Sequence, residues 1–309
     1  LQRRFQKVVE FTPAFSLPPE VKQSILDDSL KLAKHVNYNN AGTLEFLVDR
    51  GGNHYFIEMN PRIQVEHTIT EMCTGIDLVR SQILVAEGYE LSDEMIGIKS
   101  QEDIKQNGYA IQCRVTTEDP SNNFAPDTGK ITSYFSPGGF GVRLDGATSG
   151  VGSVISPYYD SLLVKITCWD NTFKNACKKT LRAIQEIRIS GVKTNIGFIS
   201  NILTNPTFIE GKCHTKFIDE TPELFNLDNG EDKSTKMLKY IATKTLAESG
   251  HHKRYDEIRM PELTGNKPDG LKQLLDSKGP KAVADWVKDQ KKLLICDTTT
   301  RDAHQSLLA

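Results

Sequence analysis

The sequence predicts a mixed α/β (α+β) fold that is divided between about two domains. Helical periodicity alternates with strand-like runs over residues 1–90. Short strands separated by long turns then fill residues 109–167, and helical periodicity returns from residue 172. A chain of 309 residues is long enough for about two domains.

The composition is that of an ordinary globular protein. The formal net charge is −2, so the charge balance gives no indication of binding to nucleic acid or to an anionic membrane. None of the apolar runs is long enough to cross a bilayer. The six cysteines are scattered without a C-x-x-C pair, which favours free thiols in a reducing compartment over disulfides or a zinc site.

The first part of the chain predicts a strand, a helix, a hairpin, a second helix and a loop, at residues 1–11, 18–36, 41–60, 74–87 and 92–108. Gly51-Gly52 stands between two alternating runs, which is a hairpin signal. The first helix has Pro18 and Pro19 near its start, where proline is tolerated.

The middle of the chain predicts a small antiparallel sheet with long turns. Its strands are expected at residues 109–117, 129–135, 141–145 and 161–169. A helix over residues 172–188 places apolar side chains on one face, and a further helix is expected after Thr194.

The last part of the chain predicts a new unit. Around residues 219–234 the chain turns acidic and loses apolar content, which indicates a domain boundary. Short helices are expected at 235–248, 270–277 and 280–290, followed by a strand at 293–297. Because the chain starts at Leu1, already strand-like, and stops just after a motif-dense turn, we expect a segment of a longer polypeptide.

The predicted hairpin brings two acids together. If Gly51-Gly52 forms a two-residue loop, Glu45 lies directly opposite Glu58, with Asn60 on the same face. The other face then carries only apolar or aromatic side chains and is expected to be a core face, formed by Leu44, Phe46, Val48, Tyr55, Ile57 and Met59.

Two carboxylates opposite each other repel, so either they lie in water or a cation sits between them. Two glutamates and an asparagine are hard oxygen ligands that suit Mg²⁺ or Mn²⁺, and magnesium held this way often also binds phosphate. A one-residue register slip would leave only a solvated face. Arg62, Gln64 and Glu66 are expected to continue the alternation; an arginine and an amide can bind a planar anion beside a carboxylate that acts as general base.

The stretch "GTLEFLVDRGGNHYFIEMNPRIQVEHTITE", residues 42–71, closely resembles the metal and bicarbonate motif of biotin carboxylases, which have the ATP-grasp fold. Further matching stretches lie at residues 2–10, 109–120, 127–131, 137–143, 156–165 and 191–196. The resemblance extends from residue 1 to about residue 220, and long motifs in the same order make it specific.

The resemblance implies a role for ten residues. Glu45, Glu58 and Asn60 match the metal ligands, with Glu45 and Glu58 also at the nucleotide. Gln2 and Lys7 match nucleotide-binding residues, and Lys7 also lies near bicarbonate and phosphate. Those matching the bicarbonate site are Arg62, Gln64 and Val65, with Glu66 as the general base; Arg114 matches the arginine that steadies the biotin enolate. The resemblance thus makes Glu66, Arg114, Lys7 and Arg62 the catalytic set.

The end of the chain resembles the single-chain pyruvate carboxylases. "DTTTRDAHQSLLA", residues 297–309, is similar to the opening of their carboxyltransferase barrel. Asp302 matches the metal ligand of that barrel, and Arg301 and Gln305 match residues around its pyruvate and biotin pocket. Two departures from the family pattern are Phe5, where a histidine near the nucleotide is common, and Ser190, in a region where arginines are associated with acetyl-CoA activation.

The resemblance implies four parts: residues 1–75 as the C-terminal part of the ATP-grasp domain, 76–221 as the biotin carboxylase C-terminal domain, 222–291 as a helical linker and tetramerisation region, and 292–309 as the first strand of a TIM barrel. The implied reaction is ATP- and biotin-dependent carboxylation of pyruvate to oxaloacetate. Its cofactors are biotin on a separate carrier domain, ATP, Mg²⁺ or Mn²⁺, and a second divalent metal in the carboxyltransferase site.

The implied partners are bicarbonate, ATP, pyruvate, the carrier domain, other copies in a tetramer and acetyl-CoA as activator, without nucleic acid or membrane. The bacterial cytosol and the mitochondrial matrix both fit. Two alternatives stay open: another biotin-dependent carboxylase, of the acetyl-CoA carboxylase type, and a non-catalytic assembly segment. We expect the isolated segment to be inactive, because the glycine-rich lid over ATP is not in it.

Overall fold

The computed structural model describes residues 1–3, 6–146, 150–158, 160–227, 237–238, 240–245 and 270–296. The chain separates into two compact units, one spanning Leu1–Leu227 and the other Asp228–Cys296. Four of the residues singled out from the sequence lie outside the described residues: Phe5, Arg301, Asp302 and Gln305.

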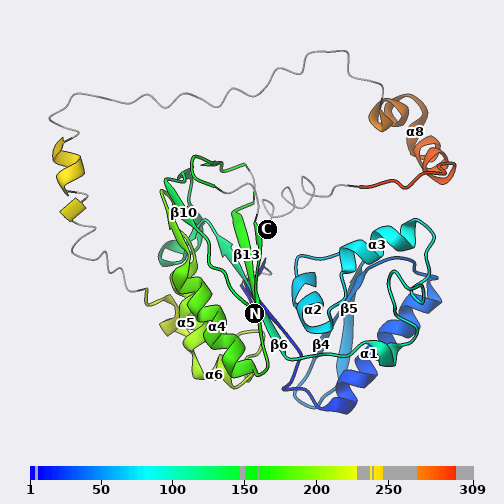
Figure 1. The fold of residues 1–309 in the computed structure, drawn as a ribbon, viewed down its shortest axis with the longest axis horizontal. Coiled ribbons are helices and arrows are strands. Elements are labelled where there is room, and N and C mark those ends of the chain that lie inside the picture. The colour runs from blue at the N-terminus through cyan, green and yellow to red at the C-terminus, as the bar shows by residue number, and fades with distance from the viewer. Residues whose placement is uncertain are drawn as a thin grey trace. The chain divides into compact units, whose positions relative to one another are not determined.

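The centre of the first unit is a four-stranded antiparallel sheet (Figure 1). Its strands, in spatial order, are β11 (Val142–Gly146), β13 (Leu162–Asp170), β6 (Tyr109–Thr116) and β3 (Val9–Thr12). The strands expected at 109–117, 141–145 and 161–169 are therefore confirmed as one antiparallel sheet. The strand expected at 129–135 is wrong, because this stretch forms two short strands, Gly129–Lys130 and Ser133–Phe135, that pair outside this sheet. The fourth strand of the sheet comes from the start of the chain, since Val9 pairs with Cys113 and Thr12 with Ala110.

One face of this sheet is the core of the unit. Alternate strand residues, such as Ile111, Cys113 and Ile166, point to this face and are fully buried. The helices that cover it are α4 (Phe173–Glu186), α5 (Ile196–Thr204) and α6 (Pro206–Ile209) (Figure 1). The predicted helices over 172–188 and after Thr194 are confirmed.

The opposite face of the same sheet is polar. The residues that alternate with the core positions on β3, β6, β13 and β11 are Glu10, Gln112, Arg114, Lys165, Thr167, Arg143 and Asp145. The short helix α2 (His67–Thr74) lies against this face, because Thr68 bonds both Gln112 and Thr167. The polar face thus carries the segment that directly follows the predicted general base.

The hairpin formed by β4 (Thr43–Val48) and β5 (His54–Asn60) confirms that Glu45 lies opposite Glu58. The predicted two-residue loop is wrong, however, because the backbone N–H of Asp49 bonds the carbonyl of Asn53 and leaves residues 50–52 as the loop. A bulge at Ile57 offsets this change, so the register is as expected at the acids and shifted by one next to the loop.

The expected core face of the hairpin is also wrong. None of its six side chains is buried, and Tyr55 and Ile57 are 56% and 49% exposed. One reason is the bulge at Ile57, which pairs Tyr55 with Leu47 and so removes Tyr55 from the face of Phe46 and Val48. Helix α1 (Pro19–His35), which confirms the helix predicted over 18–36, contacts the hairpin through an Asp28–His54 bond of 2.8 Å.

The segment after the hairpin differs from the prediction. The strand ends at Asn60, because Pro61 has no N–H for the ladder, and residues 61–66 form turns instead of continuing the alternation. The helix expected over 74–87 begins later than predicted, as α3 (Leu78–Ala86), and α2, which ends at Thr74, was not predicted. Gly75 has a φ of 72°, which ends α2 in the left-handed conformation that glycine favours.

Short elements complete the first unit. They are β1 (Gln2–Arg3), β2 (Gln6–Lys7), η1 (Gln101–Asp103), β7 (Glu118–Asp119), η2 (Pro120–Asn122), β8 (Ala125–Pro126), β9 (Gly129–Lys130), β10 (Ser133–Phe135), β12 (Val154–Ile155), β14 (Arg188–Ser190) and η3 (Pro222–Phe225). The predicted strand over residues 1–11 is therefore three short strands, and the stretch 92–108 is mainly loop, as expected.

The second unit is helical in its described part. Residues 237–238 and 240–245 are helical, and α8 spans Leu271–Lys288. Gly279 interrupts α8 with a φ of 77°, so this element is the pair of helices predicted on either side of Pro280. The strand expected at 293–297 is not formed over residues 293–296, because no described strand pairs with them.

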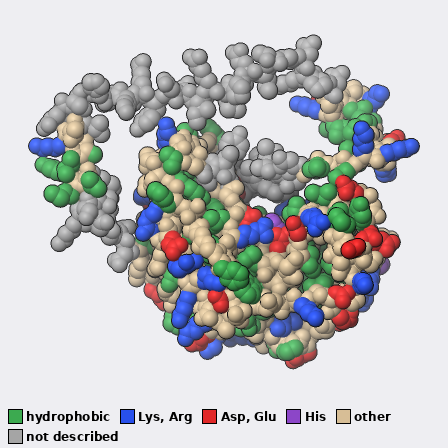
Figure 2. Space-filling view, in the orientation of Figure 1, with side chains coloured by type: hydrophobic (Ala, Val, Ile, Leu, Met, Phe, Trp, Pro, Cys, Tyr) green, Lys and Arg blue, Asp and Glu red, His purple; other side chains and the backbone are tan. Residues whose placement is uncertain are grey.

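The surface and the thiols agree with the composition. On the drawn face, acidic and basic side chains are interspersed among the described residues, without a field of a single sign (Figure 2). All six cysteines are free, and four of them are buried. No helix among the described residues is long and apolar enough to cross a membrane.

Candidate active site

Ten predicted site residues line one cavity of about 680 Å³ in the first unit. They are Gln2, Lys7, Glu45, Glu58, Asn60, Arg62, Gln64, Val65, Glu66 and Arg114. These residues come from β1, β2, the hairpin, the following turn and β6, so they are brought together only by folding. All of the predicted first-site residues are thus described, and all of them meet at one place.

The acid pair of the hairpin is bridged by an amide. Asn60 Nδ2 donates to Glu58 Oε1 at 2.8 Å and reaches Glu45 Oε1 at 3.4 Å. The position of this amide group is where the two carboxylates converge. Since the two ends of an asparagine amide are nearly equivalent in shape, a half-turn would present its oxygen to the same point.

These residues fit a hard divalent cation. Two carboxylates and one amide supply oxygen ligands on one side, and the open cavity leaves the other side for water or phosphate oxygens. Among the described residues, no group of three His, Cys, Asp or Glu side chains is placed to hold a metal, so this mixed set is not a site built of acids alone.

Lys7 joins the acid pair to the predicted general base. Its Nζ lies 2.9 Å from Glu45 Oε1 and 2.5 Å from Glu66 Oε1. Burial by itself lowers the pKa of Lys7, but its bonds to Glu66 and Glu45 outweigh burial and raise that pKa above its ordinary value. Lys7 therefore carries its positive charge throughout the physiological pH range.

Glu45 accepts hydrogen bonds from Lys7 and Gln64, and both favour its charged form. Burial raises the pKa of Glu45, whereas hydrogen bonds from Gln64 and Lys7 lower it, and the net result is a lowered pKa. The Gln64 Nε2 atom donates at 3.0 Å. Gln64 thus ties the turn after the hairpin to the acid pair.

Arg114 faces two carboxylates. Its Nη2 lies 2.5 Å from Glu10 Oε1 and 3.4 Å from Glu66 Oε1, and its Nε donates to the same Glu10 oxygen at 2.7 Å. Among the described residues, no bond occupies Nη1. The guanidinium is therefore held from the sheet side while one edge stays available to a ligand in the cavity.

Sequence reasoning missed Glu10. This side chain is 9% exposed, and it also accepts from Gln112 Nε2 at 3.0 Å. Burial raises the pKa of Glu10, and the charge of Arg114 opposes that rise. An acid at the end of the apolar run "KVVEF" is a signal that could have found it, because a strand seldom buries a carboxylate without a partner.

The turn that carries Arg62, Gln64 and Val65 is fixed by several backbone contacts. The N–H of Arg62 bonds the carbonyl of Asn60, and the N–H of His67 bonds that of Gln64. Arg62 Nη1 donates to the carbonyl of Ile63 at 3.2 Å. His67 Nδ1 lies 2.9 Å from the Gln64 carbonyl oxygen, so this ring also contacts the turn.

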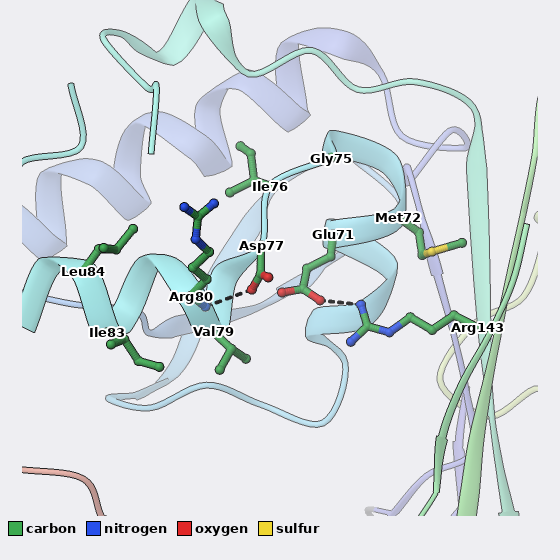
Figure 3. A pocket seen from close by; sticks show the side chains of 10 residues that line it. All are labelled: Glu71, Met72, Gly75, Ile76, Asp77, Val79, Arg80, Ile83, Leu84 and Arg143. Atoms are coloured by element: carbon green, nitrogen blue, oxygen red, sulfur yellow. Dashed lines mark hydrogen bonds and ion pairs between the residues drawn. The ribbon is translucent and has the colours of Figure 1, made fainter. Parts of the chain in front are cut away.

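The far end of α2 is fastened to the polar face of the sheet. Glu71 on α2 pairs with Arg143 on β11 (Figure 3). Glu71 also accepts from the N–H of Leu78, the first residue of α3. Asp77 caps α3 by accepting from the N–H of Arg80 (Figure 3). The helix that begins after Glu66 is thus held at both ends.

Two family models match the chain. "Biotin carboxylase C-terminal domain" matches residues 112–220, and "Carbamoyl-phosphate synthase L chain, ATP binding domain" matches residues 1–94. The pyruvate carboxylase of Bacillus subtilis is 53% identical over 316 aligned residues, which cover 100% of this chain and 27% of that protein. Over its whole length the chain is similar to a segment of the pyruvate carboxylases. It spans about a quarter of the length of the curated pyruvate carboxylases that it matches.

Solved structures agree with this relationship. The complete multifunctional pyruvate carboxylase of Rhizobium etli matches 99% of this chain with 47% identity and a TM-score of 0.76, and the match covers 29% of that chain. The biotin carboxylase domain of the Hydrogenobacter thermophilus 2-oxoglutarate carboxylase matches 74% of this chain and 49% of its own, with 45% identity and a TM-score of 0.70. That domain was solved with MgADP, ADP and bicarbonate.

Proposed function

We propose that this pyruvate carboxylase segment forms the site where bicarbonate is activated with MgATP and its carboxyl group is passed to biotin, in an enzyme that converts pyruvate to oxaloacetate. The observation that carries the proposal is the convergence of ten side chains on one cavity of about 680 Å³. The biotin carboxylase domain from Hydrogenobacter thermophilus, solved with MgADP and bicarbonate, supports the same assignment.

Glu45, Glu58 and Asn60 are proposed to hold Mg²⁺ or Mn²⁺, and Gln2 and Lys7 to contact the nucleotide. The metal, when bound, supplies positive charge next to phosphate oxygens. Lys7 contributes a second charge on the same side of the cavity, 2.9 Å from Glu45. These residues would thus fix the position of the phosphate relative to the bicarbonate site.

Arg62, Gln64 and the backbone of Val65 are proposed to bind bicarbonate, with Glu66 as its general base. The ammonium of Lys7, 2.5 Å from Glu66 Oε1, holds the carboxylate of this base in one orientation. Arg114 is proposed to stabilise negative charge on the ureido oxygen of biotin, because one guanidinium edge faces the cavity.

The second site of the proposed enzyme lies outside the described residues. Asp302 is proposed as a ligand of the carboxyltransferase metal, and Arg301 and Gln305 as residues of the pyruvate and biotin pocket. A carrier domain bearing biotin, a tetramer of the full-length enzyme and activation by acetyl-CoA belong to the same proposal. The proposal also includes the division of the chain into four parts, at residues 1–75, 76–221, 222–291 and 292–309.

The test uses the full-length carboxylase that contains this chain. We expect Glu66→Gln and Glu58→Gln each to lower bicarbonate-dependent ATP cleavage by at least about a hundredfold. Glu118→Gln is the matched control, since Glu118 lines the same cavity but bonds only Thr116 and Ser161. Normal cleavage in either of the first two variants would refute the assignment.

The choice of acceptor separates pyruvate carboxylase from the acetyl-CoA carboxylase type. The full-length enzyme is expected to carboxylate pyruvate and to leave acetyl-CoA unchanged, measured with ¹⁴C-bicarbonate. Carboxylation of acetyl-CoA in place of pyruvate would keep the biotin carboxylation site and overturn the assigned acceptor.

A further inference from the structure

Lys165 on β13 is a charged residue in a strand of the core sheet. Its neighbours Val164 and Ile166 are buried among apolar side chains on one face, and Lys165 points to the other. Burial is the main reason why its pKa is lowered from the ordinary value. A half-buried lysine in such a strand needs partners that offset its loss of water.

The partner that Lys165 finds is the turn of the candidate site. Its Nζ donates to the backbone carbonyl of Val65 at 3.2 Å, across 100 residues of sequence. This carbonyl belongs to the peptide unit that joins Val65 to Glu66. Fixing it therefore fixes the plane of that peptide and the direction in which Glu66 leaves the backbone.

The place of Lys165 in the sheet explains why it reaches this peptide. It lies directly opposite Arg114 on β6 and Asp145 on β11. Arg114 contacts the carboxylate of Glu66, while Lys165 contacts the carbonyl just before it. Two neighbouring positions of one sheet thus hold the side chain of Glu66 and the peptide that joins it to Val65.

The charges around Lys165 come from both neighbouring strands, β6 and β11, and from β3 beyond β6. Arg114 faces it from β6, Asp145 and Arg143 from β11, and Glu10 from β3. Asp145 is already engaged by Arg143 at 3.0 Å, so it does not draw Lys165 away from the turn. The hydrogen bond of the ammonium goes to the neutral carbonyl of Val65.

We propose that Lys165 is a positioning residue. It fixes the orientation of the Val65–Glu66 peptide, so that the carboxylate of Glu66 is correctly placed relative to the proposed bicarbonate-binding residues Arg62, Gln64 and Val65. This inference rests on the proposed function, because it assigns Lys165 to the same bicarbonate site. Lys165 contacts neither acid of the pair and is not among the residues that line the cavity, so it acts through the backbone of Val65. Replacing Lys165 should therefore lower kcat/KM for bicarbonate and leave KM for MgATP unchanged.

The experiment compares Lys165→Met with Lys165→Arg in the full-length carboxylase. We expect Lys165→Met to lower kcat/KM for bicarbonate by about tenfold to a hundredfold and to leave KM for MgATP within about twofold. Lys165→Arg keeps a charged donor and is expected to recover kcat/KM to within about threefold of the unmodified enzyme.

Lys179→Met is the matched control. Lys179 also donates from a half-buried ammonium to a backbone carbonyl, that of Trp169 at 2.8 Å, but it has no contact with the turn. We expect its bicarbonate and MgATP constants to change by less than about twofold. Mn²⁺ affinity at the acid pair, measured in all variants, reports that the hairpin is folded.

The outcomes separate the two proposals. If Glu66→Gln abolishes ATP cleavage while Lys165→Met keeps its bicarbonate constants, the role of Lys165 is overturned and the function stands. The role of Lys165 is likewise overturned if Lys179→Met lowers kcat/KM for bicarbonate by as much as Lys165→Met does. The same holds if Lys165→Met raises KM for bicarbonate and KM for MgATP together. If Glu66→Gln is harmless, the proposed function itself fails. Should Lys165→Met not fold, the shorter neutral variant Lys165→Gln takes its place in every comparison.

Discussion

Lys7 Nζ and Glu66 Oε1 lie 2.5 Å apart, although the two residues are far apart in the sequence. The same ammonium lies 2.9 Å from Glu45. One cation therefore neutralises a carboxylate of the acid pair and the predicted general base together. This shared contact joins the start of the chain, the hairpin and the turn before α2 into one site.

Replacing Lys7 with methionine is expected to lower the free energy of unfolding of the chain by about 1.5–3 kcal/mol near neutral pH, because charged hydrogen bonds to two acids are lost. The sign of the pH dependence follows from the two pKa shifts. The raised pKa of Lys7 makes its contribution complete below its ordinary value of 10.5 and lost as the pH rises through the raised pKa. The lowered pKa of Glu45 makes its contribution complete above 4.5 and lost as the pH falls through the lowered pKa.

Urea unfolding of the unmodified and Lys7→Met chains from pH 3 to pH 11 measures this difference. It should be largest on the plateau between those two values and shrink on both sides. Lys174→Met is the control, since Lys174 is exposed on α4 and far from the cavity. A difference that is equally large at all pH values would contradict the ion-pair account.

Arg114→Met is expected to destabilise the chain by about 3–5 kcal/mol, because it leaves the buried Glu10 carboxylate without its charged partner. Burial already raises the pKa of Glu10, and loss of Arg114 raises it further. A raised carboxyl pKa means that stability is lost as the pH rises through it, so the defect should be smaller at pH 5 than at pH 8.

The double variant Arg114→Met/Glu10→Gln tests this coupling. Removing the buried charge as well should recover part of the lost stability, which a thermodynamic cycle of urea midpoints measures. Arg182→Met provides the reference for an exposed pair, because Arg182 contacts Glu186 at the surface; its effect should stay within about 1 kcal/mol. Strict additivity of the two buried substitutions would show that Glu10 and Arg114 act independently.

Glu45→Gln is expected to weaken Mn²⁺ binding to the full-length carboxylase by at least about tenfold, because a carboxylate ligand becomes a neutral amide. Titration followed by electron paramagnetic resonance measures free Mn²⁺ directly. Glu118→Gln removes a charge from the same cavity and should keep the affinity. Equal weakening in both variants would indicate a general field effect and not a ligand.

The six thiols should react in three groups, set by burial. Burial raises the pKa of Cys73 and Cys168 to about 11 and that of Cys177 to about 12, and it raises that of Cys113 well above its ordinary range. These thiols stay protonated and shielded at pH 8, so a thiol reagent should label them only after unfolding. Cys296 is exposed and should react at once.

Mass spectrometry of peptides after timed labelling identifies the reacted positions. Cys213 serves as the internal comparison, since it is only partly buried while its pKa is raised to about 11. We expect its reaction to be slower than that of Cys296. Rapid native labelling of Cys113 would show that the sheet core opens on the timescale of the reagent.

Much of the architecture followed from local pattern. The helix at Pro19–His35, the hairpin, the strands of the antiparallel sheet and α4 were predicted from periodicity and turn residues alone. The opposition of Glu45 and Glu58 also followed, although two errors cancelled. A longer loop and a bulge at Ile57 each shift the register by one residue, and sequence pattern could show neither.

Three predictions from strand-like residue patterns were wrong, each for a physical reason. The hairpin's apolar side chains, such as Tyr55, were expected in a core because alternation marks a face and does not say what covers it. The alternation of Arg62, Gln64 and Glu66 suggested a strand, but Pro61 ends the ladder there. Leu293–Cys296 has strand composition but no neighbouring strand among the described residues.

The sequence by itself predicted which residues form the candidate site and which chemistry is proposed for them, because acids, an amide and an arginine at fixed spacing have few uses and a close family resemblance names them. Only the tertiary structure decided which of them touch. Glu10 and Lys165 lie in otherwise apolar strands and carry no signal of their partners. They meet Arg114 and Val65 because four strands far apart in the sequence form one sheet whose polar face receives the turn.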